Sequence, residues 1–233
     1  CPMLAESAAK LYNGNLGRWQ NIIDILVGEK IQDLYLLGGI PKSLLFAGLE
    51  LDGRIMSLLA ELKQKNDSAM IEAFVKDLAS EGIIVRPQTD LLEDALLGPG
   101  VITKTSPSAQ DRADIEYGIY VAKGLAKLDI GQTVVVKAGA VLAVEAIDGT
   151  DATITRGGRL ARGGGVVVKI AKPHQDLRFD VPTVGIKTIE TVIDGGLKTL
   201  ALEAGKTIIV DKAQVVEKAN AAGISILLMD LEK

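Results

Sequence analysis

Histidine, cysteine and aromatic residues are scarce in this sequence, and each shortage excludes a kind of site. The 233 residues include one Cys and one His, and 3% are aromatic. A single cysteine cannot form an internal disulfide, which fits a reducing, cytoplasmic location. Zinc sites built mainly from Cys and His are excluded too. Platforms that stack nucleic-acid bases need aromatic side chains, which this chain has in short supply.

An excess of basic charge and long apolar runs are also lacking. The chain has 26 basic and 30 acidic residues, for a formal net charge of −4. Because nucleic-acid-binding domains normally carry a basic stripe, we expect no nucleic-acid partner. The longest apolar stretches, such as 165–168 and 224–228, fall far short of the roughly 18 residues of a membrane span. No basic amphipathic helix is evident, so any contact with a membrane is expected to be weak and peripheral.

Apolar residues, by contrast, are plentiful enough for packed cores. They make up 48% of the chain, and the mean hydropathy is +0.26. Such a composition argues against disorder, and the length predicts one large or two modest domains. The chain begins at Cys1 without Met and lacks a signal-peptide pattern. We therefore expect it to be the interior of a longer protein whose opening segment is missing.

The first part of the chain alternates helix-like and strand-like patterns. Apolar residues from Trp19 to Leu26 follow the i, i+3, i+4, i+7 spacing of an amphipathic helix. Residues 34–37 predict a buried strand, and residues 83–85 predict another. Helices are predicted between them over 53–64 and 68–81. This alternation indicates an α/β domain with a parallel sheet.

Gly98-Pro99-Gly100 is the best candidate linker, which divides the chain into domains at 1–98 and 101–233. A helix over 111–127 follows, with Ser108 and Asp111 as its N-terminal cap. Strands then dominate, so the second domain is predicted to be α+β with a mixed sheet. Two hairpins are predicted, 133–136 with 141–144 and 199–202 with 207–210; single strands over 163–170 and 224–228; and a helix over 211–222 capped by Asp211.

The densest polar segment runs from residue 169 to residue 183, after a valine-rich strand. Lys172 and Arg178 can neutralise phosphate oxygens, while Asp176 and Asp180 can bind a hard cation or orient a water molecule. Cations beside carboxylates suit phosphoryl transfer, which depends on positioning and charge stabilisation. The alternative is a solvated loop whose charges pair with one another.

A second acidic segment, residues 145–151, follows the strand at 141–144. It predicts metal or phosphate binding through Glu145 and Asp151, or else a helix start capped by one of its polar residues. Lys104, before the helix at 111–127, is a candidate phosphate contact, although a plain Ser108 cap explains the same segment.

Three glycine-containing segments carry weaker predictions. Gly39 follows a strand end and is a candidate nucleotide contact, or a turn that needs positive φ. Residues 156–165 predict a mobile cationic loop or a plain linker. Gly205-Lys206-Thr207 resembles the end of a phosphate-binding loop, but position 200 is Leu where that motif needs Gly, so we expect a hairpin turn.

The polar segments together resemble a known family. They are Val141-Leu142-Ala143-Val144-Glu145-Ala146-Ile147-Asp148-Gly149-Thr150-Asp151, the run from Val168 to Gly185, and Leu202-Glu203-Ala204-Gly205. With residues 128–132, they are similar to the LpxI-type UDP-2,3-diacylglucosamine pyrophosphatases. The resemblance runs through most of 101–233 and continues more weakly from Leu16 to about residue 100.

The resemblance implies a fold, an activity and a site. It implies a Rossmann-like N-terminal domain, truncated here, joined to an α+β catalytic domain, and a homodimer. It implies hydrolysis of the lipid-linked sugar nucleotide UDP-2,3-diacylglucosamine to UMP and 2,3-diacylglucosamine 1-phosphate (lipid X), assisted by Mg²⁺ or Mn²⁺. The family's motifs fall on Glu145, Gly149, Thr150, Asp151, Lys172, Pro173, Gln175, Arg178, Asp180 and Thr183.

These residues define a hypothesis for the mechanism. Asp180, with Asp151 or Glu145, holds a metal ion or orients the attacking water, and Lys172 and Arg178 stabilise the developing charge. Substrate contacts are expected at Gly39, Lys104, Thr150, Gln175 and Thr183. The alternatives are a non-catalytic protein that binds sugar nucleotides or lipid phosphates, and a transferase that passes the sugar phosphate to an acceptor.

Overall fold

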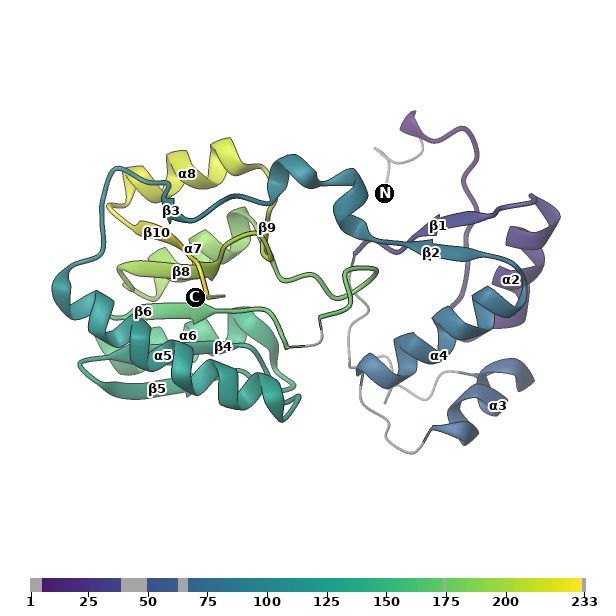
Figure 1. Ribbon diagram of the computed structural model, residues 1–233, viewed down its shortest axis with the longest axis horizontal. Helices are drawn as coiled ribbons and strands as arrows, with labels where there is room; N and C mark the ends of the chain where they lie inside the picture. The colour runs from purple at the N-terminus through teal and green to yellow at the C-terminus, as the bar shows by residue number, and fades with distance from the viewer. Residues whose placement is uncertain (1–5, 39–49, 63–66, 174, 232–233) are drawn as a thin grey trace. The chain divides into compact units, whose positions relative to one another are not determined.

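The computed structural model describes residues 6–38, 50–62, 67–173 and 175–231. Its contacts divide the chain into two compact units, Cys1–Arg86 and Pro87–Lys233. Both units mix helices with strands, so the predicted α/β class is confirmed (Figure 1).

A pair of parallel strands and the helices α2 (Trp19–Gly28), α3 (Gly53–Glu61) and α4 (Asp67–Ser80) make up the elements of the first unit whose bounds the structure describes. Strand β1 (Asp33–Tyr35) pairs with β2 (Ile84–Arg86), as the alternating pattern predicts. Strand β1 is less buried than expected. Leu37, which was predicted to be its last residue, lies just beyond it and is 62% exposed. Two strands do not establish a Rossmann-like sheet, so that detail stays a prediction.

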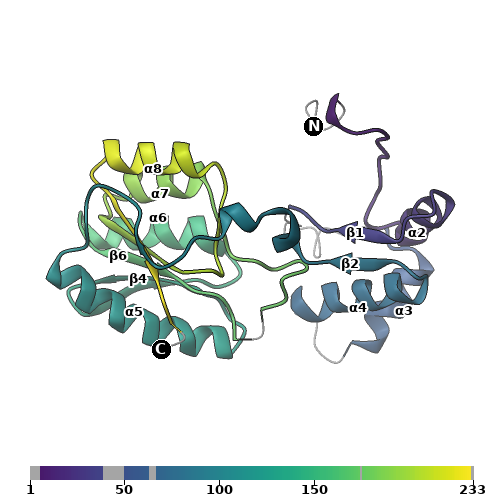
Figure 2. The same ribbon diagram turned by 45° about the horizontal axis from the view of Figure 1, so that its top comes forward.

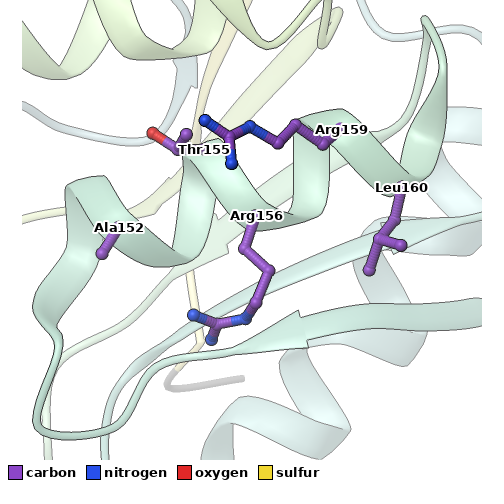
Figure 3. A pocket seen from close by; sticks show the side chains of 5 residues that line it. All are labelled: Ala152, Thr155, Arg156, Arg159 and Leu160. Carbon is purple, nitrogen blue, oxygen red and sulfur yellow. The ribbon is translucent and has the colours of Figure 1, made fainter.

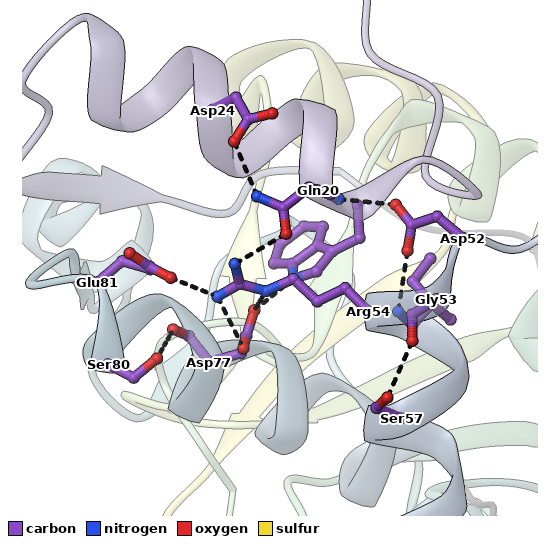
Figure 4. Close-up of polar contacts among 11 residues, drawn as sticks. Gln20, Asp24, Asp52, Gly53, Arg54, Ser57, Asp77, Ser80 and Glu81 are labelled. Carbon is purple, nitrogen blue, oxygen red and sulfur yellow. Dashed lines mark hydrogen bonds and ion pairs between the residues drawn. The ribbon is translucent and has the colours of Figure 1, made fainter.

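A polar network joins the three helices of this unit (Figure 4). Trp19 packs against Phe74 with ring centroids 4.7 Å apart, and its indole N–H donates to Asp77 at 2.7 Å. Arg54 donates to both carboxylate oxygens of Asp77, and also to Glu81 and Gln20. We call Trp19, Gln20, Arg54, Asp77 and Glu81 the Arg54 network.

The second unit is built on a six-stranded mixed sheet with the order β3-β10-β8-β6-β4-β5. The central strands β6, β8 and β10 are parallel, while β3 and β4 run antiparallel to their neighbours. The bounds are β3 Gly100–Val101, β4 Thr133–Lys137, β5 Ala140–Val144, β6 Val166–Lys169, β8 Thr199–Glu203 and β10 Ser225–Met229. The predicted mixed sheet and the β4–β5 hairpin are confirmed.

Helices cover both faces of this sheet (Figure 2). Helix α5 (Ala109–Lys127) packs on one face, where its Ala122 joins the core formed by Val134 and Val136. The intervening Val135 points to the other face and joins Ile154 of α6. Valine runs of this kind suit strands that are buried on both faces. The second face carries α6 (Gly149–Ala161), α7 (Ile186–Asp194) and α8 (Lys212–Ala221).

Two predicted helix caps had different outcomes. Ser108 and Asp111 form a reciprocal capping box at the start of α5, as predicted. Helix α8 is present, but the Asp211 cap was wrong. Asp211 has φ 52° and its side chain makes no capping hydrogen bond, because the left-handed backbone there does not have the extended geometry of a capping residue.

The predicted hairpin of 199–202 with 207–210 was wrong. Strand β8 instead pairs in parallel with β6 and β10, and β9 (Ile208–Ile209) pairs in parallel with β7 (Thr183–Val184). All five residues of β8 are buried. A strand buried in this way gains more from two sheet neighbours and two helical layers than from one hairpin partner. The turn at Gly205 therefore leads the chain out of the sheet.

Residues 156–165 form neither a loop nor a linker over most of their length, because α6 continues to Ala161. Its glycines serve close packing. A Cβ atom on Gly157 would lie 2.5 Å from the Cβ of Val135, and one on Gly158 would lie 2.5 Å from the Cα of Gly195. The helix therefore approaches both the sheet and the end of α7 more closely than any larger residue allows.

Candidate active site

One edge of the second unit's sheet gathers most of the predicted site residues. Strands β5, β6, β8 and β10 all run in the same direction, so their carboxyl ends meet at this edge. Glu145 follows β5, Lys169 ends β6 and Glu203 ends β8. Thr150 and Asp151 lie in the first turn of α6, which begins at the same edge. Ligands of α/β sheets commonly bind at such carboxyl ends.

Lys169 lies at the centre of this group. The residue is only 5% exposed, and its ammonium donates to the Thr150 hydroxyl at 2.8 Å. Burial lowers the pKa of Lys169 below its ordinary value, against the opposing attraction of Glu145, Asp151 and Asp180. The two predicted acidic segments therefore act on one buried cation. We call these three acids and Lys169 the Lys169 cluster.

Glu145 is held through both of its carboxylate oxygens. The Thr150 hydroxyl donates to Oε1 at 2.8 Å, and the backbone N–H of Gln132 donates to Oε2 at 3.3 Å. The neighbouring chain comes close enough that a Cβ atom on Gly131 would lie 2.2 Å from the Glu145 carbonyl oxygen. Glycine at position 131 is thus required for this approach.

Lys172 joins the polar loop to the same edge. Its ammonium lies 2.7 Å from Asp129 and 3.4 Å from Asp180. Burial lowers the pKa of Lys172, but the hydrogen bonds and charges of Asp129 and Asp180 outweigh it and raise the pKa overall. On the other side of the cluster, Lys187 lies 3.0 Å from Asp151. Asp180 is half-buried rather than on an open outer face.

Gln175 and Thr183 brace the loop that carries Asp180. Gln175 accepts from the backbone N–H of Lys172 at 2.8 Å and donates to the carbonyl oxygen of Asp180. Thr183 donates to the Val181 carbonyl at 3.0 Å. Their described contacts are with the loop's own backbone, so they shape the loop.

Arg178 and Asp176 form their own ion pair, with Nη2 2.6 Å from Oδ2. The hydrogen bond from Arg178 is the main cause that lowers the pKa of Asp176. The guanidinium also lies 5.7 Å from the centre of the Phe179 ring. These contacts support the alternative that part of this loop pairs its own charges.

Two predicted contacts are not brought to the Lys169 cluster. Lys104 follows β3, which runs antiparallel to β10 and so leads toward the opposite edge of the sheet. There the Lys104 backbone N–H donates to Asn220 at 2.7 Å. Gly39 lies outside the described residues.

The acids do not form a ready metal site. Across the described ranges, no three His, Cys, Asp or Glu side chains are grouped so that they could hold a metal ion. Glu145 is bound by Thr150 and Gln132, while Asp151 and Asp180 face the lysines 187 and 172. As arranged, these carboxylates are held by protein cations and N–H or O–H donors and do not fit a three-ligand metal centre.

A hollow of about 600 Å³ lies elsewhere on the second unit (Figure 3). Its lining residues all belong to α6, and Arg156 among them is tied to Asp148 and to the Val144 carbonyl. It is therefore a shallow, open helix surface rather than an enclosed site. The lining residues are Ala152, Thr155, Arg156, Arg159 and Leu160.

The sequence reasoning did not single out Lys169. A signal was present, because this lysine directly follows three valines of a strand that is predicted to be buried. Lysine is rarely buried unless it is paired. A lysine at the end of such a strand, just before a polar loop, is therefore expected to face charged partners.

The fold and the site define an α/β protein of two units with buried and half-buried cations among acids at a sheet edge, a combination suited to phosphorylated substrates. The LpxI N-terminal domain matches residues 2–95, and the LpxI C-terminal domain matches residues 98–227. The UDP-2,3-diacylglucosamine pyrophosphatase LpxI of Caulobacter vibrioides is 35% identical over 226 residues, which cover 92% of this chain and 80% of that protein. The chain belongs to the LpxI family. None of the helices in its described parts has the length and apolar character needed to cross a membrane.

Proposed function

We propose that this chain hydrolyses the diphosphate of UDP-2,3-diacylglucosamine, releasing UMP and 2,3-diacylglucosamine 1-phosphate during lipid A synthesis. The observation that carries the proposal is the meeting of Lys172, Asp180 and the Lys169 cluster at one sheet edge. The substrate is taken from the name of the Caulobacter relative.

In this proposal Asp180 acts as the general base and Lys172 stabilises negative charge on the phosphate oxygens. The Asp180 carboxylate orients a water molecule and accepts its proton as the water oxygen attacks one phosphorus atom and the bridging P–O bond breaks. The ammonium of Lys172, 3.4 Å from Asp180, faces the charge that gathers on the phosphate oxygens. Arg178 adds a second cation once substrate competes with Asp176 for its guanidinium.

The remaining expectations belong to the same proposal. Thr150, Gln175 and Thr183 contact or shape the substrate site. A homodimer and weak contact with the inner membrane suit a protein whose substrate carries acyl chains. No step is placed on Mg²⁺ or Mn²⁺, because the described acids are held by other groups.

The test is release of UMP from UDP-2,3-diacylglucosamine in detergent micelles, measured with added Mg²⁺, with Mn²⁺ and with a chelator. We expect Asp180→Ala to lower kcat by about 100- to 10,000-fold, the range for loss of a general base. Asp194→Ala, at the exposed end of α7, is the matched control and is expected to keep full activity.

Three results contradict parts of the proposal. Full activity of Asp180→Ala removes the role given to that residue. Binding of the sugar nucleotide without UMP release favours a non-catalytic binding protein. Retention of the sugar phosphate on an acceptor indicates a transferase. Loss of activity with the chelator, restored by Mg²⁺, supports the expected metal dependence.

A further inference from the structure

We propose that Lys169 is a positioning residue, whose ammonium fixes the Thr150 hydroxyl and, through it, the Glu145 carboxylate. This inference rests on the proposed function, because it assigns Lys169 a part in the same hydrolysis. Lys169 lies in the run from Val168 to Gly185 that carries the resemblance, but the resemblance gives it no role.

The two shorter hydrogen bonds give this chain of groups one direction, and the Thr133 hydroxyl lies farther from the Thr150 oxygen, at 3.5 Å. An ammonium group has no acceptor, so Lys169 must donate to the Thr150 oxygen, 2.8 Å away. The Thr150 proton is then free to point at Oε1 of Glu145, also 2.8 Å away. The Gln132 N–H donates to the other oxygen. The Glu145 side chain is therefore held in one orientation.

The charges of the cluster give Lys169 a second effect. Glu145, Asp151 and Asp180 all attract its ammonium. Among the residues that the structure describes, however, the ammonium has only the Thr150 hydroxyl as a hydrogen-bond acceptor. Asp180 and Asp151 also face Lys172 and Lys187, but Lys169 is the cation that attracts all three carboxylates. Lys169 thus keeps acids from two distant segments together.

Positioning of this kind affects the chemical step more than substrate binding. Catalysis by preorganised charges requires that they keep their geometry before the transition state forms. Lys169 is 5% exposed and one of its N–H groups donates to Thr150, so its removal is expected to disturb Glu145 without removing a contact on the substrate's outer parts.

The kinetic test compares Lys169→Met, Lys169→Arg and the wild type in the UMP assay. We expect Lys169→Met to lower kcat by about 10- to 100-fold, the range for removing a group that orients a functional ligand. KM should change by less than about threefold, and Lys169→Arg should recover part of the loss because it keeps the charge and the donors. Unchanged kcat in Lys169→Met overturns the inference.

Lys137→Met is the matched control for a merely structural effect. Lys137 ends the neighbouring strand β4 at the opposite edge, where its ammonium donates to the carbonyl oxygens of Ala161 and Gly163 at 2.6 Å. This variant should lose thermal stability but keep kcat. An equal loss of kcat in both variants would show that Lys169 acts through stability alone.

The order of the groups is tested with Thr150→Val. If Lys169 acts through Thr150, the double variant Lys169→Met/Thr150→Val should be no slower than the slower single variant, because both changes break the same chain of hydrogen bonds. Losses that multiply would overturn the proposed order.

A crystal structure of Lys169→Met separates this inference from the proposed function. We expect the Glu145 carboxylate to turn away from Thr150 or to lose its contact with the Gln132 N–H. If the carboxylate keeps both contacts, the positioning role is wrong even when the wild type is active. If the wild type releases no UMP but Glu145 turns in the variant, the proposed function fails and the positioning role stands.

Discussion

The Arg54 network and the Lys169 cluster both place a basic side chain among acids, but they differ in how well the charges are matched. Arg54 makes four side-chain hydrogen bonds, to Asp77, Glu81 and Gln20. Within the described ranges Lys169 makes one, to an uncharged hydroxyl, although three carboxylates attract it. The first network is satisfied within the protein, and the second is not.

This difference distinguishes a structural ion pair from a site. Buried charges are tolerated when they are paired and hydrogen-bonded, which is what Arg54 achieves. A buried lysine whose one described hydrogen bond goes to a hydroxyl is retained at a cost in stability, and such perturbed groups are concentrated where proteins act on ligands. We therefore expect changes to the Arg54 network to affect stability, and changes to the Lys169 cluster to affect turnover.

The largest expected stability effect comes from Arg54→Met. It leaves the Asp77 carboxylate, 12% exposed, without its cation, and breaking such a pair is expected to lower the free energy of unfolding by about 3 kcal/mol. Trp19 is the only tryptophan and belongs to this network. Its fluorescence during urea titration therefore reports on the first unit.

The control for Arg54→Met is Lys76→Met, which removes an exposed i,i+4 ion pair with Glu72 on α4. Its cost should stay below about 0.5 kcal/mol. Equal urea midpoints for the two variants would remove the distinction between matched and exposed pairs. A large loss of kcat in Arg54→Met, at temperatures where the protein stays folded, would contradict the expectation that the Arg54 network affects stability and the Lys169 cluster affects turnover.

A smaller effect is expected for Asp114→Ala, which tests a satisfied acid within the second unit itself. Asp114 is 2% exposed and accepts from the backbone N–H groups of Ala138 and Gly139 in the β4–β5 turn. Losing both bonds should cost about 2 kcal/mol. Faster hydrogen exchange at the two amides, with kcat unchanged, is the expected result. A loss of activity without a loss of stability in Asp114→Ala would contradict the expectation that a satisfied acid affects stability rather than turnover.

The smallest stability effect is expected for Gly131→Ala, which moves the cluster's backbone. The added Cβ would lie 2.2 Å from the Glu145 carbonyl oxygen, so the chain must shift at a cost of about 1–2 kcal/mol. The kcat should fall as Glu145 moves. Gly124 is an exposed position of α5, where an added Cβ meets nothing within 4 Å. Gly124→Ala should therefore stabilise the protein by about 0.5–1 kcal/mol. Equal melting temperatures for these variants would contradict the close approach.

Local patterns in the sequence predicted most of the elements. The capping residues Ser108 and Asp111 and the helix that follows them were predicted correctly, because caps and helix periodicity depend on spacings within one or two helical turns. The β4–β5 hairpin was also predicted, because its strands are joined by a short turn. The family motifs marked Glu145, Asp151 and Asp180 as polar residues near strand ends.

The sequence by itself determined where most of the helices and strands lie and that acids and lysines follow the strands. Only the tertiary structure decided that β8 lies between β6 and β10 and that Lys169 lies among three acids from two segments. The reason is physical. Helix periodicity and capping depend on neighbours along the chain, whereas strand order and charge neighbours depend on which distant surfaces bury each other best.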